Sequence, residues 1–168
     1  PKPSTIISMG NKDVARDLAI KNNLPICPGL KDEDLKKDDL EKKCNEIGYP
    51  ILIKAAGGGG GKGMRVVQKE EDLKESIKSA QREAQSGFGD DRVFIERYVQ
   101  KSRHIEIQIL GDAHGNVVHL GERECSIKRR HQKIIEESPS SRVSENVRAE
   151  MGNAAIKLAK KIKYKDRK

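Results

Sequence analysis

The stretch Pro50-Ile-Leu-Ile-Lys-Ala-Ala-Gly-Gly-Gly-Gly-Gly-Lys-Gly-Met-Arg-Val-Val67 places five successive glycines between two short apolar runs. The runs 50–56 and 64–67 have the aliphatic composition of strands, so they predict a β-hairpin with residues 57–63 at its tip. Glycines add nothing to packing and are entropically costly to order. Their advantage is close backbone approach, because free N–H groups can surround phosphate oxygens while Lys62 adds positive charge. The stretch therefore indicates a phosphate-binding loop.

Two better-known phosphate motifs do not fit this loop. A Walker A motif would need Gly where the chain has Ala56 and Ser or Thr where it has Gly63. A dinucleotide-binding turn leads from a strand into a helix, whereas this loop joins two strands. A floppy hairpin tip without function is the remaining alternative. Lys54 favours the functional interpretation, because a lysine in an apolar strand just before the loop can bind the α- and β-phosphates.

The flanking segments predict a small α/β unit around the hairpin. Residues 24–98 have the order strand, helix, hairpin, helix, strand, which is expected of a lid on something larger. Pro25 and Pro28 interrupt an upstream helix, and Gly48 ends the next one. The expected helices are 11–22, 32–47, 70–86 and 144–162, the last with Ser144 as its cap. The other expected strands are 92–99, 104–110 and 117–122, with loops and short strands over 125–137.

Composition narrows the classes of function. The chain has 168 residues with a net charge of +8, but its 36% of charged residues mostly alternate in sign, as solvated helix faces do. Two Phe, three Tyr and no Trp do not favour a base-stacking surface for nucleic acid. Cys27, Cys44 and Cys125 form no Cys-x-x-Cys pair, which predicts a reducing compartment without disulfides or zinc. No apolar run predicts a membrane span, and the missing initiator Met indicates a processed or excised chain.

A second basic cluster occupies residues 123–133. On its own this cluster fits a nuclear-localisation or RNA-binding patch as well as a substrate pocket. Alternate residues of an extended segment share a face, so His131 and Lys133 could point into one pocket, where the lysine holds a small anion and the histidine a ribose. His104 alone is more typical of a structural histidine. His114 and His119 read as turn and surface residues, and the methionines 9, 64 and 151 as packing residues.

Together these stretches resemble the biotin carboxylase component of biotin-dependent carboxylases, which is an ATP-grasp family. The most specific matches are the five-glycine loop and Arg129-Arg-His-Gln-Lys133. The resemblance extends over about residues 9–164, through the matching stretches 9–12, 47–65, 94–98, 103–112, 121–127 and 129–137. It implies an α+β ATP-grasp fold: the end of an N-terminal domain with its linker helix (1–26), a small α/β lid with the glycine-rich hairpin (27–98), and the truncated start of the antiparallel C-terminal subdomain (99–168).

The resemblance also implies a reaction and a site. In this family, ATP phosphorylates bicarbonate to carboxyphosphate, and the released CO2 carboxylates biotin on a carrier protein. Lys133 is the implied catalytic and bicarbonate-binding residue, and Glu96 is expected to bond the adenine amino group through its backbone carbonyl. The implied ATP-binding residues are Lys12, Lys54, Gly57, Gly58, Gly59, Gly60, Gly61, Met64, Glu96, Arg97, Tyr98, Val99, His104 and His131. The glycines form the lid loop, residues 96–99 the hinge strand, and the two histidines lie on the ribose side.

The implied partners are ATP, bicarbonate, a biotin carboxyl carrier domain and a carboxyltransferase, without nucleic acid or membrane, in a full-length form that is oligomeric. Mg2+ ligands are expected beyond this chain and not within it, so the chain alone is expected to be incomplete for catalysis. The expected compartment is the cytoplasm or the mitochondrial matrix.

Residues 88–92 and 123–127 look most like the propionyl-CoA type. The alternatives are another ATP-grasp carboxylate–amine ligase or a carbamoyl-phosphate synthetase-like module, which generally lack Arg-Arg-His-Gln-Lys, and a basic nucleic-acid-binding module. Lys128 departs from the family, which usually has Gln there, and the chain ends without the family's Gly-Thr strand.

Overall fold

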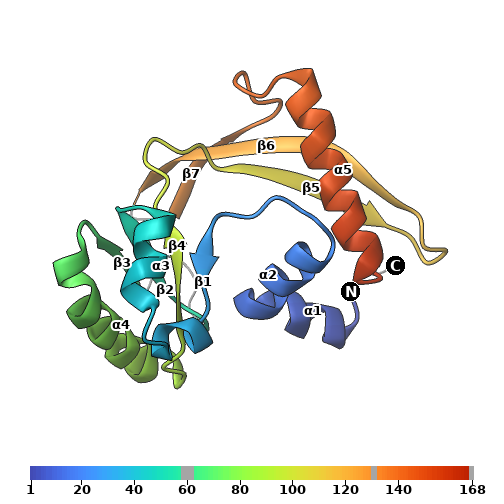
Figure 1. Ribbon diagram of the computed structural model, residues 1–168. Coiled ribbons are helices and arrows are strands. Elements are labelled where there is room, and N and C mark those ends of the chain that lie inside the picture. The colour runs from blue at the N-terminus through green and yellow to red at the C-terminus, as the bar shows by residue number, and fades with distance from the viewer. Residues whose placement is uncertain (58–62, 130–131, 167–168) are drawn as a thin grey trace. The chain divides into compact units, whose positions relative to one another are not determined.

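The computed structural model describes residues 1–57, 63–129 and 132–166. The chain divides into two compact units, each built around its own antiparallel sheet (Figure 1). Unit 1 comprises Pro1–Gly10, Val14–Pro25 and Lys101–Lys168, and unit 2 comprises Asn11–Asp13 and Ile26–Gln100. Among the helices of the described residues, none has the length and apolar character that crossing a membrane requires.

Unit 2 contains the predicted order of strand, helix, hairpin, helix and strand. Its elements are β1 (Gly29–Leu30), the 3-10 helices η1 (Asp32–Lys36) and η2 (Glu70–Asp72), α3 (Leu40–Ile47), β2 (Ile51–Ala55), β3 (Met64–Val67), α4 (Leu73–Phe88) and β4 (Val93–Arg97). The strands lie in the order β1-β4-β2-β3, so the predicted hairpin of β2 and β3 is present at one edge of the sheet.

The predicted helix over 32–47 is wrong in its first half. Residues 32–36 form a 3-10 helix, and the backbone of Lys37 is extended before α3 begins. The Asp34 carboxylate accepts a hydrogen bond from the Lys31 backbone N–H at 3.3 Å and one from the Lys37 ammonium at 2.7 Å. The first of these bonds satisfies a backbone N–H at the start of the 3-10 helix, and the break lies at Lys37, whose extended backbone separates this helix from α3. Gly48 ends α3 as predicted, with a φ of +86° that favours glycine.

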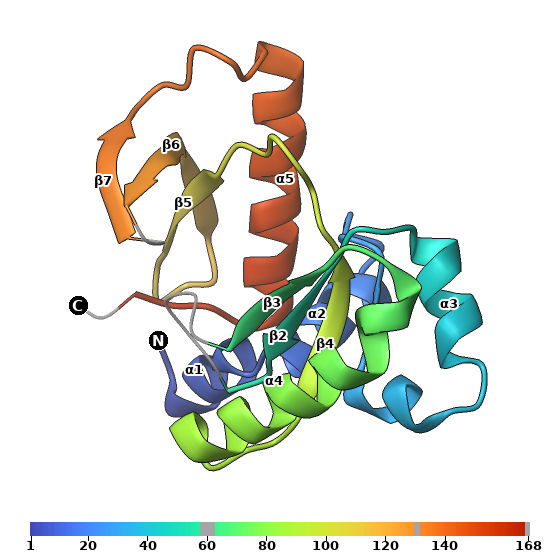
Figure 2. The same cartoon turned by 90° about the vertical axis from the view of Figure 1, so that its left-hand side faces the viewer.

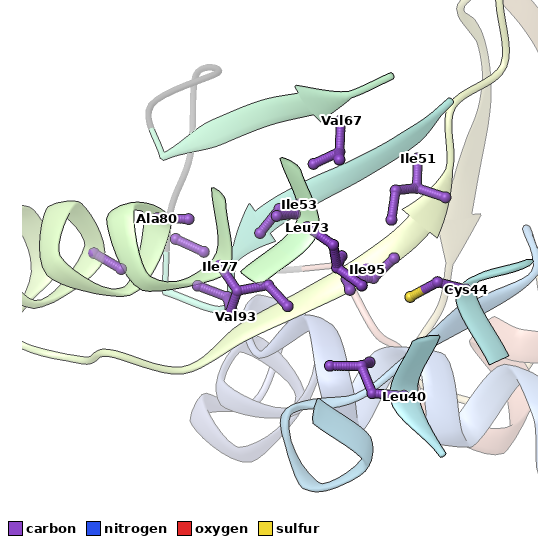
Figure 3. Packing of buried hydrophobic residues seen from close by; sticks show 12 residues of the cluster. Leu40, Cys44, Ile51, Ile53, Val67, Leu73, Ile77, Ala80, Val93 and Ile95 are labelled. Carbon is purple, nitrogen blue, oxygen red and sulfur yellow. The ribbon is translucent and has the colours of Figure 1, made fainter. Parts of the chain in front are cut away.

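The core of unit 2 lies between one face of its sheet and the helices α3 and α4. Figure 3 shows side chains from all three elements meeting there. Ile51 and Ile53 of β2 are fully buried, as is Ile95 of β4. Leu73 of α4 and Cys44 of α3 are also fully buried. Because burial in this layer removes apolar surface from water, it fixes which face of the sheet points inward.

Unit 1 pairs a three-stranded sheet with a long helix. Its elements are α1 (Pro3–Gly10), α2 (Lys12–Lys21, the start of which belongs to unit 2), β5 (Ile105–Gly111), β6 (Val117–Arg129), β7 (Gln132–Glu137) and α5 (Glu145–Lys161). The strand order is β5-β6-β7, and α5 packs along β5 and β6 (Figure 2). Ser144 caps α5 as predicted, because its hydroxyl oxygen accepts the Val147 N–H at 3.4 Å.

The sequence predictions for unit 1 miss the structure in two places. Residues 125–137 were expected to be loops and short strands, but β6 continues to Arg129 and β7 covers 132–137. All of β7 is exposed, and its sequence lacks the alternation of polar and apolar residues that marks a half-buried strand. The strand was therefore not recognisable from its own residues. Helix α1 was not predicted either. It begins at Pro3, a residue that is well tolerated in the first turn of a helix.

A buried ion pair joins β6, α5 and the segment between β7 and α5. Arg148 donates to both carboxylate oxygens of Glu122, at 2.7 Å from Nε and 2.8 Å from Nη2. The Ser140 backbone N–H donates to the same carboxylate at 3.1 Å, and the Glu122 side chain is 1% exposed. These hydrogen bonds, led by those from Arg148, lower the pKa of Glu122 to about 2. The carboxylate is therefore charged although it is buried.

His119 has a packing role that was not predicted from the sequence. Its ring lies against Gly152 on α5, where an added Cβ would come within 2.5 Å of the His119 Nε2 atom. His119 also accepts a hydrogen bond from the Gly121 N–H through Nδ1, at 3.3 Å. The absence of a side chain at Gly152 thus lets α5 approach the sheet closely.

The variant Gly152→Ala is expected to lower the free energy of unfolding by about 1–3 kcal/mol, because overpacking outweighs the gain in helix propensity. Urea unfolding followed by circular dichroism measures the change. The matched control is Asn153→Ala, at an exposed position of the same helix, which should be neutral or slightly stabilising. Combining Gly152→Ala with His119→Ala should recover most of the loss. A Gly152→Ala variant as stable as the parent would contradict the close approach.

Candidate functional site

The sheet of unit 2 has a second face, opposite the core. Lys54 is paired with Met64 on β3 and with Phe94 on β4, while Leu52 is paired with Val66 and Glu96. Residues directly opposite each other in antiparallel strands share a face, and so do residues two apart. The second face therefore carries the following six side chains: Leu52, Lys54, Met64, Val66, Phe94 and Glu96. Leu52 and Phe94 are buried, whereas Met64 and Val66 are exposed.

Lys54 and Glu96 form an ion pair on this face. Lys54 Nζ lies 2.5 Å from Glu96 Oε2, and the two side chains are 26% and 19% exposed. The same ammonium lies 5.8 Å from the centre of the Phe94 ring, within the range of a cation–π interaction. The long Lys54 side chain is thus restrained by the Glu96 carboxylate and by the Phe94 ring.

Lys12 brings a second ammonium group to unit 2. Its Nζ donates to the Ala55 carbonyl oxygen at 3.3 Å, at the end of β2. Burial lowers the pKa of Lys12, the nearby charge of Lys54 lowers it further, and Glu96 raises it. The predicted pair of phosphate ligands, Lys12 and Lys54, is therefore close enough to interact electrostatically, with Glu96 as a shared counter-ion.

The ends of the glycine-rich loop are anchored to β2. The Gly63 carbonyl oxygen accepts the Ala55 N–H at 3.1 Å, and the Ala56 N–H donates to the Arg92 carbonyl oxygen at 2.9 Å. Gly63 has a φ of +69°, and a Cβ there would lie 2.9 Å from the Ala55 Cβ. A side chain is therefore excluded at this position. The predicted contacts of Gly58, Gly59, Gly60 and Gly61 lie outside the described residues, whereas Gly57 is described at the start of the loop.

In the predicted hinge strand, residues 96–99, two backbone N–H groups already donate hydrogen bonds within unit 2. The Arg97 N–H donates to the Pro28 carbonyl oxygen at 2.9 Å, and the Tyr98 N–H donates to the Pro50 carbonyl oxygen at 3.0 Å. Tyr98 and Val99 are exposed, at 37% and 54%. These two amides tie the end of β4 to its neighbours, so a nucleotide contact by Arg97 or Tyr98 would use another group of the residue.

Unit 1 contains a separate ionic cluster on its sheet. Glu106 of β5 is at its centre and accepts a short hydrogen bond from Lys133 of β7. Arg123 of β6 donates to the other Glu106 oxygen at 3.1 Å and lies 3.6 Å from Glu136. The hydrogen bond from Lys133 lowers the pKa of Glu106, and the same contact raises the pKa of Lys133. The predicted bicarbonate ligand is therefore charged and paired with a carboxylate.

His104 joins this cluster, and its neighbours determine its tautomer. The Lys128 ammonium contacts Nδ1 of the ring, and Nε2 lies 2.8 Å from Glu106 Oε1. An ammonium has no acceptor, so Nδ1 accepts the hydrogen bond while Nε2 carries the proton and donates to Glu106. Lys128, the departure from the family pattern, thus has a direct partner. The other predicted ribose contact, His131, lies outside the described residues.

Several residues of these two clusters were missed at the level of sequence. Leu52, Phe94 and Val66 were assigned no role beyond their strands, and Glu106 and Glu136 were assigned none, whereas Arg123 was included in the basic cluster without a partner. The signal was present in the alternation of β2 and β4, which places Glu96 on the same face as Lys54. The Glu106 partners depend on the register of β6 and β7, which a single sequence does not specify.

Chemically, the second face of unit 2 fits a nucleotide. The exposed Met64 and Val66 offer apolar surface, and Lys54 of this face and the neighbouring Lys12 suit phosphate oxygens. A divalent metal is less well provided for. Within residues 1–57, 63–129 and 132–166, no group of three or more His, Cys, Asp or Glu side chains is placed to hold a metal ion.

Comparisons with known proteins agree with this chemistry. Residues 11–167 match the family model described as carbamoyl-phosphate synthase L chain, ATP binding domain. The mitochondrial methylcrotonoyl-CoA carboxylase subunit alpha of Dictyostelium discoideum is 50% identical over 98% of the chain, and biotin carboxylase 1 of Bacillus subtilis is 48% identical over 98%. A crystal structure described as a biotin carboxylase-beta-gamma-ATP complex from Campylobacter jejuni superposes with a TM-score of 0.87, at 44% identity over 96% of the chain.

The chain spans only part of each of these proteins. It covers 24% of the Dictyostelium protein and 36% of the Bacillus protein. It likewise covers 36% of the Campylobacter chain.

Proposed function

The chain belongs to the carbamoyl-phosphate synthase L chain ATP-binding domain family and is a biotin carboxylase ATP-grasp domain, and we propose that it binds the ATP of a biotin carboxylase. The predicted α+β ATP-grasp fold and the predicted family are thereby confirmed. The activity of the whole protein is part of the proposal, because the chain spans about a third or less of these relatives.

The whole protein is proposed to be a ligase that uses ATP and bicarbonate to carboxylate biotin. The bond that forms first joins a bicarbonate oxygen to the γ-phosphorus, and the bond to the β,γ-bridging oxygen breaks, which leaves ADP and carboxyphosphate. Carboxyphosphate then releases phosphate and CO2, the N1′–H bond of biotin breaks as its proton passes to the released phosphate, and N1′ bonds to the CO2 carbon. Mg2+ would neutralise charge on the phosphates when it is bound. In unit 1, Lys133 is proposed to bind bicarbonate, and His104 and His131 to approach the ribose.

The observation that carries the proposal is the second face of unit 2, where Lys54 and Glu96 stand beside apolar side chains at the base of the glycine loop. Hydrogen–deuterium exchange with and without ATP tests it. We expect ATP to slow exchange in peptides that cover β2, β3 and β4. A peptide from the exposed turn at residues 112–116 of unit 1 is the internal reference and should not change. Saturating ATP without any effect on the three strands would refute the proposed site.

Turnover by the chain alone is not expected. The metal ligands are proposed to lie beyond this chain, and phosphoryl transfer depends on metal ions that neutralise the developing charge. Release of inorganic phosphate from ATP should therefore be the same with and without bicarbonate. A full-length protein of this family measured in parallel is the positive control. Bicarbonate-dependent ATP hydrolysis by the isolated chain would overturn this part of the proposal.

The proposed partners of the whole protein are a biotin carboxyl carrier domain and a carboxyltransferase, in an oligomeric assembly. The proposed compartment is the cytoplasm or the mitochondrial matrix, and the Dictyostelium relative is named as mitochondrial. The predicted resemblance to the propionyl-CoA type stays a prediction, and so does the assignment of residues 27–98 as the lid.

A further inference from the structure

We propose that the Glu96 carboxylate is a positioning residue, which orients the Lys54 ammonium for the phosphates of the nucleotide. This inference rests on the proposed ATP-binding function and deepens it. The resemblance assigned Glu96 only a backbone contact with adenine, and it assigned the side chain no role. The side chain nevertheless accepts a hydrogen bond from the Lys54 ammonium, at 2.5 Å.

The pairing of β2 with β4 brings the Lys54 and Glu96 side chains together. Glu96 is opposite Leu52 on β2, and Lys54 lies two residues further along the same face. The two side chains therefore meet diagonally across neighbouring strands, which is a distance that long side chains can cover. The backbone of Glu96 is in turn paired with Gly29 of β1. A Cβ at Gly29 would lie 2.2 Å from the Ile95 carbonyl oxygen, so β1 fits closely against β4 at this point.

Holding Lys54 has an energetic benefit for binding. A free lysine side chain loses rotamer entropy when it is fixed on a ligand. Glu96 and the Phe94 ring have already restricted Lys54 before a nucleotide arrives. An ammonium has three donors, so one can stay on Glu96 while the others bond phosphate oxygens. Protein kinases use the same device, a strand lysine that needs its glutamate partner in order to hold ATP phosphates.

The Glu96 carboxylate could instead weaken ATP binding, so the test must distinguish a loss of affinity from a gain. A carboxylate close to the phosphates repels them and competes for the ammonium. If competition dominated, removal of the Glu96 charge would tighten ATP binding. If Glu96 positions Lys54, removal of the charge weakens ATP binding, and the weakening disappears once Lys54 is also removed. A double-mutant cycle separates these cases.

The experiment measures the dissociation constants of ATP and of adenosine by isothermal titration calorimetry for the complete 168-residue chain. The variants are Glu96→Gln, Lys54→Met and the double variant. We expect Glu96→Gln to weaken ATP binding about tenfold in the parent chain and less than about twofold in the Lys54→Met background. Adenosine binding should change less than about twofold throughout, because it has no phosphates.

Controls keep the outcomes distinct. Glu75→Gln, an exposed glutamate on α4 of the same unit, is the matched charge control and should bind ATP like the parent. Thermal unfolding of each variant checks that unit 2 remains folded. Tighter ATP binding by Glu96→Gln, or an equal loss in both backgrounds, would overturn the positioning role. Failure of the parent chain to bind ATP would instead refute the proposed function itself.

Discussion

Replacing Arg148 by Met is expected to lower the free energy of unfolding of unit 1 by about 3–5 kcal/mol, because the change leaves a buried carboxylate without its cationic partner. Glu122 is 1% exposed and would keep backbone donors such as the Ser140 N–H, but would lose the guanidinium that donates to both of its oxygens. Methionine preserves most of the aliphatic packing of arginine, so the lost charge dominates. Urea unfolding followed by circular dichroism at neutral pH measures the effect.

The control for this variant is Lys157→Met, at an exposed position of α5, which should change stability by less than about 0.5 kcal/mol. If unit 1 of the Arg148→Met variant does not fold, the double variant Glu122→Leu/Arg148→Met remains informative. Replacing both partners by apolar groups removes the unpaired charge and should restore most of the stability. Equal stabilities of the parent and Arg148→Met would show that the pair contributes nothing.

The pH dependence of the same variant gives an independent check. The pKa of Glu122 is lowered from its ordinary value of 4.5 to about 2 in the folded protein. Its contribution is therefore fully present above about pH 5 and is lost as the pH falls through 2. Since Arg148→Met lacks this contribution, the stability difference between parent and variant should shrink across that window. A difference that stays constant down to pH 2 would argue against the ion pair as its cause.

Lys54→Met is expected to weaken ATP binding by about tenfold to a hundredfold, because a hydrogen bond to a charged phosphate contributes about 1.5–3 kcal/mol. Methionine retains the aliphatic stem over the Phe94 ring but has no donor. Isothermal titration with ATP measures the loss, and adenosine, which has no phosphates, should bind with unchanged affinity. Stability of unit 2 should fall only slightly, because the lost ion pair is partly exposed.

The matched control is Lys69→Met. Lys69 lies in the same unit, its side chain is 65% exposed, and it pairs only loosely with Glu71 at 3.6 Å. This variant should bind ATP as the parent does. Two results would count against the nucleotide site: equal ATP affinity of Lys54→Met and the parent, or an equal loss in both lysine variants. In the second case the effect would come from net charge and not from a specific contact.

The strongest local signals in the sequence predicted the fold of unit 2 well. The hairpin, the helix end at Gly48 and the order of elements follow from short-range chemistry, which a single chain displays. The helix over 32–47 failed because the backbone becomes extended at Lys37, where the sequence has no Gly or Pro to signal a break. In β7 the failure has another origin, because its residues are stabilised by partners on other strands and carry no local pattern.

The site shows the same division. Lys12, Lys54 and Lys133 were found from residue type and from the family resemblance. Their partners, Glu96 and Glu106, depend on the register between strands that are distant in the chain. The role of Lys128 also needed the structure, because only the pairing of β6 with β5 brings it to the His104 ring. Cross-strand neighbours are thus the part of the site that a single sequence leaves undetermined.

β2 supplies alternate residues to two different purposes. Ile51, Ile53 and Ala55 belong to the packed interior, while Leu52 and Lys54 belong to the face proposed for the nucleotide. Loss of a single residue within this strand would exchange the two sets, so the ammonium would enter the interior and an isoleucine would take its place. We therefore expect unit 2 to tolerate substitutions in β2 better than a deletion or insertion within the strand.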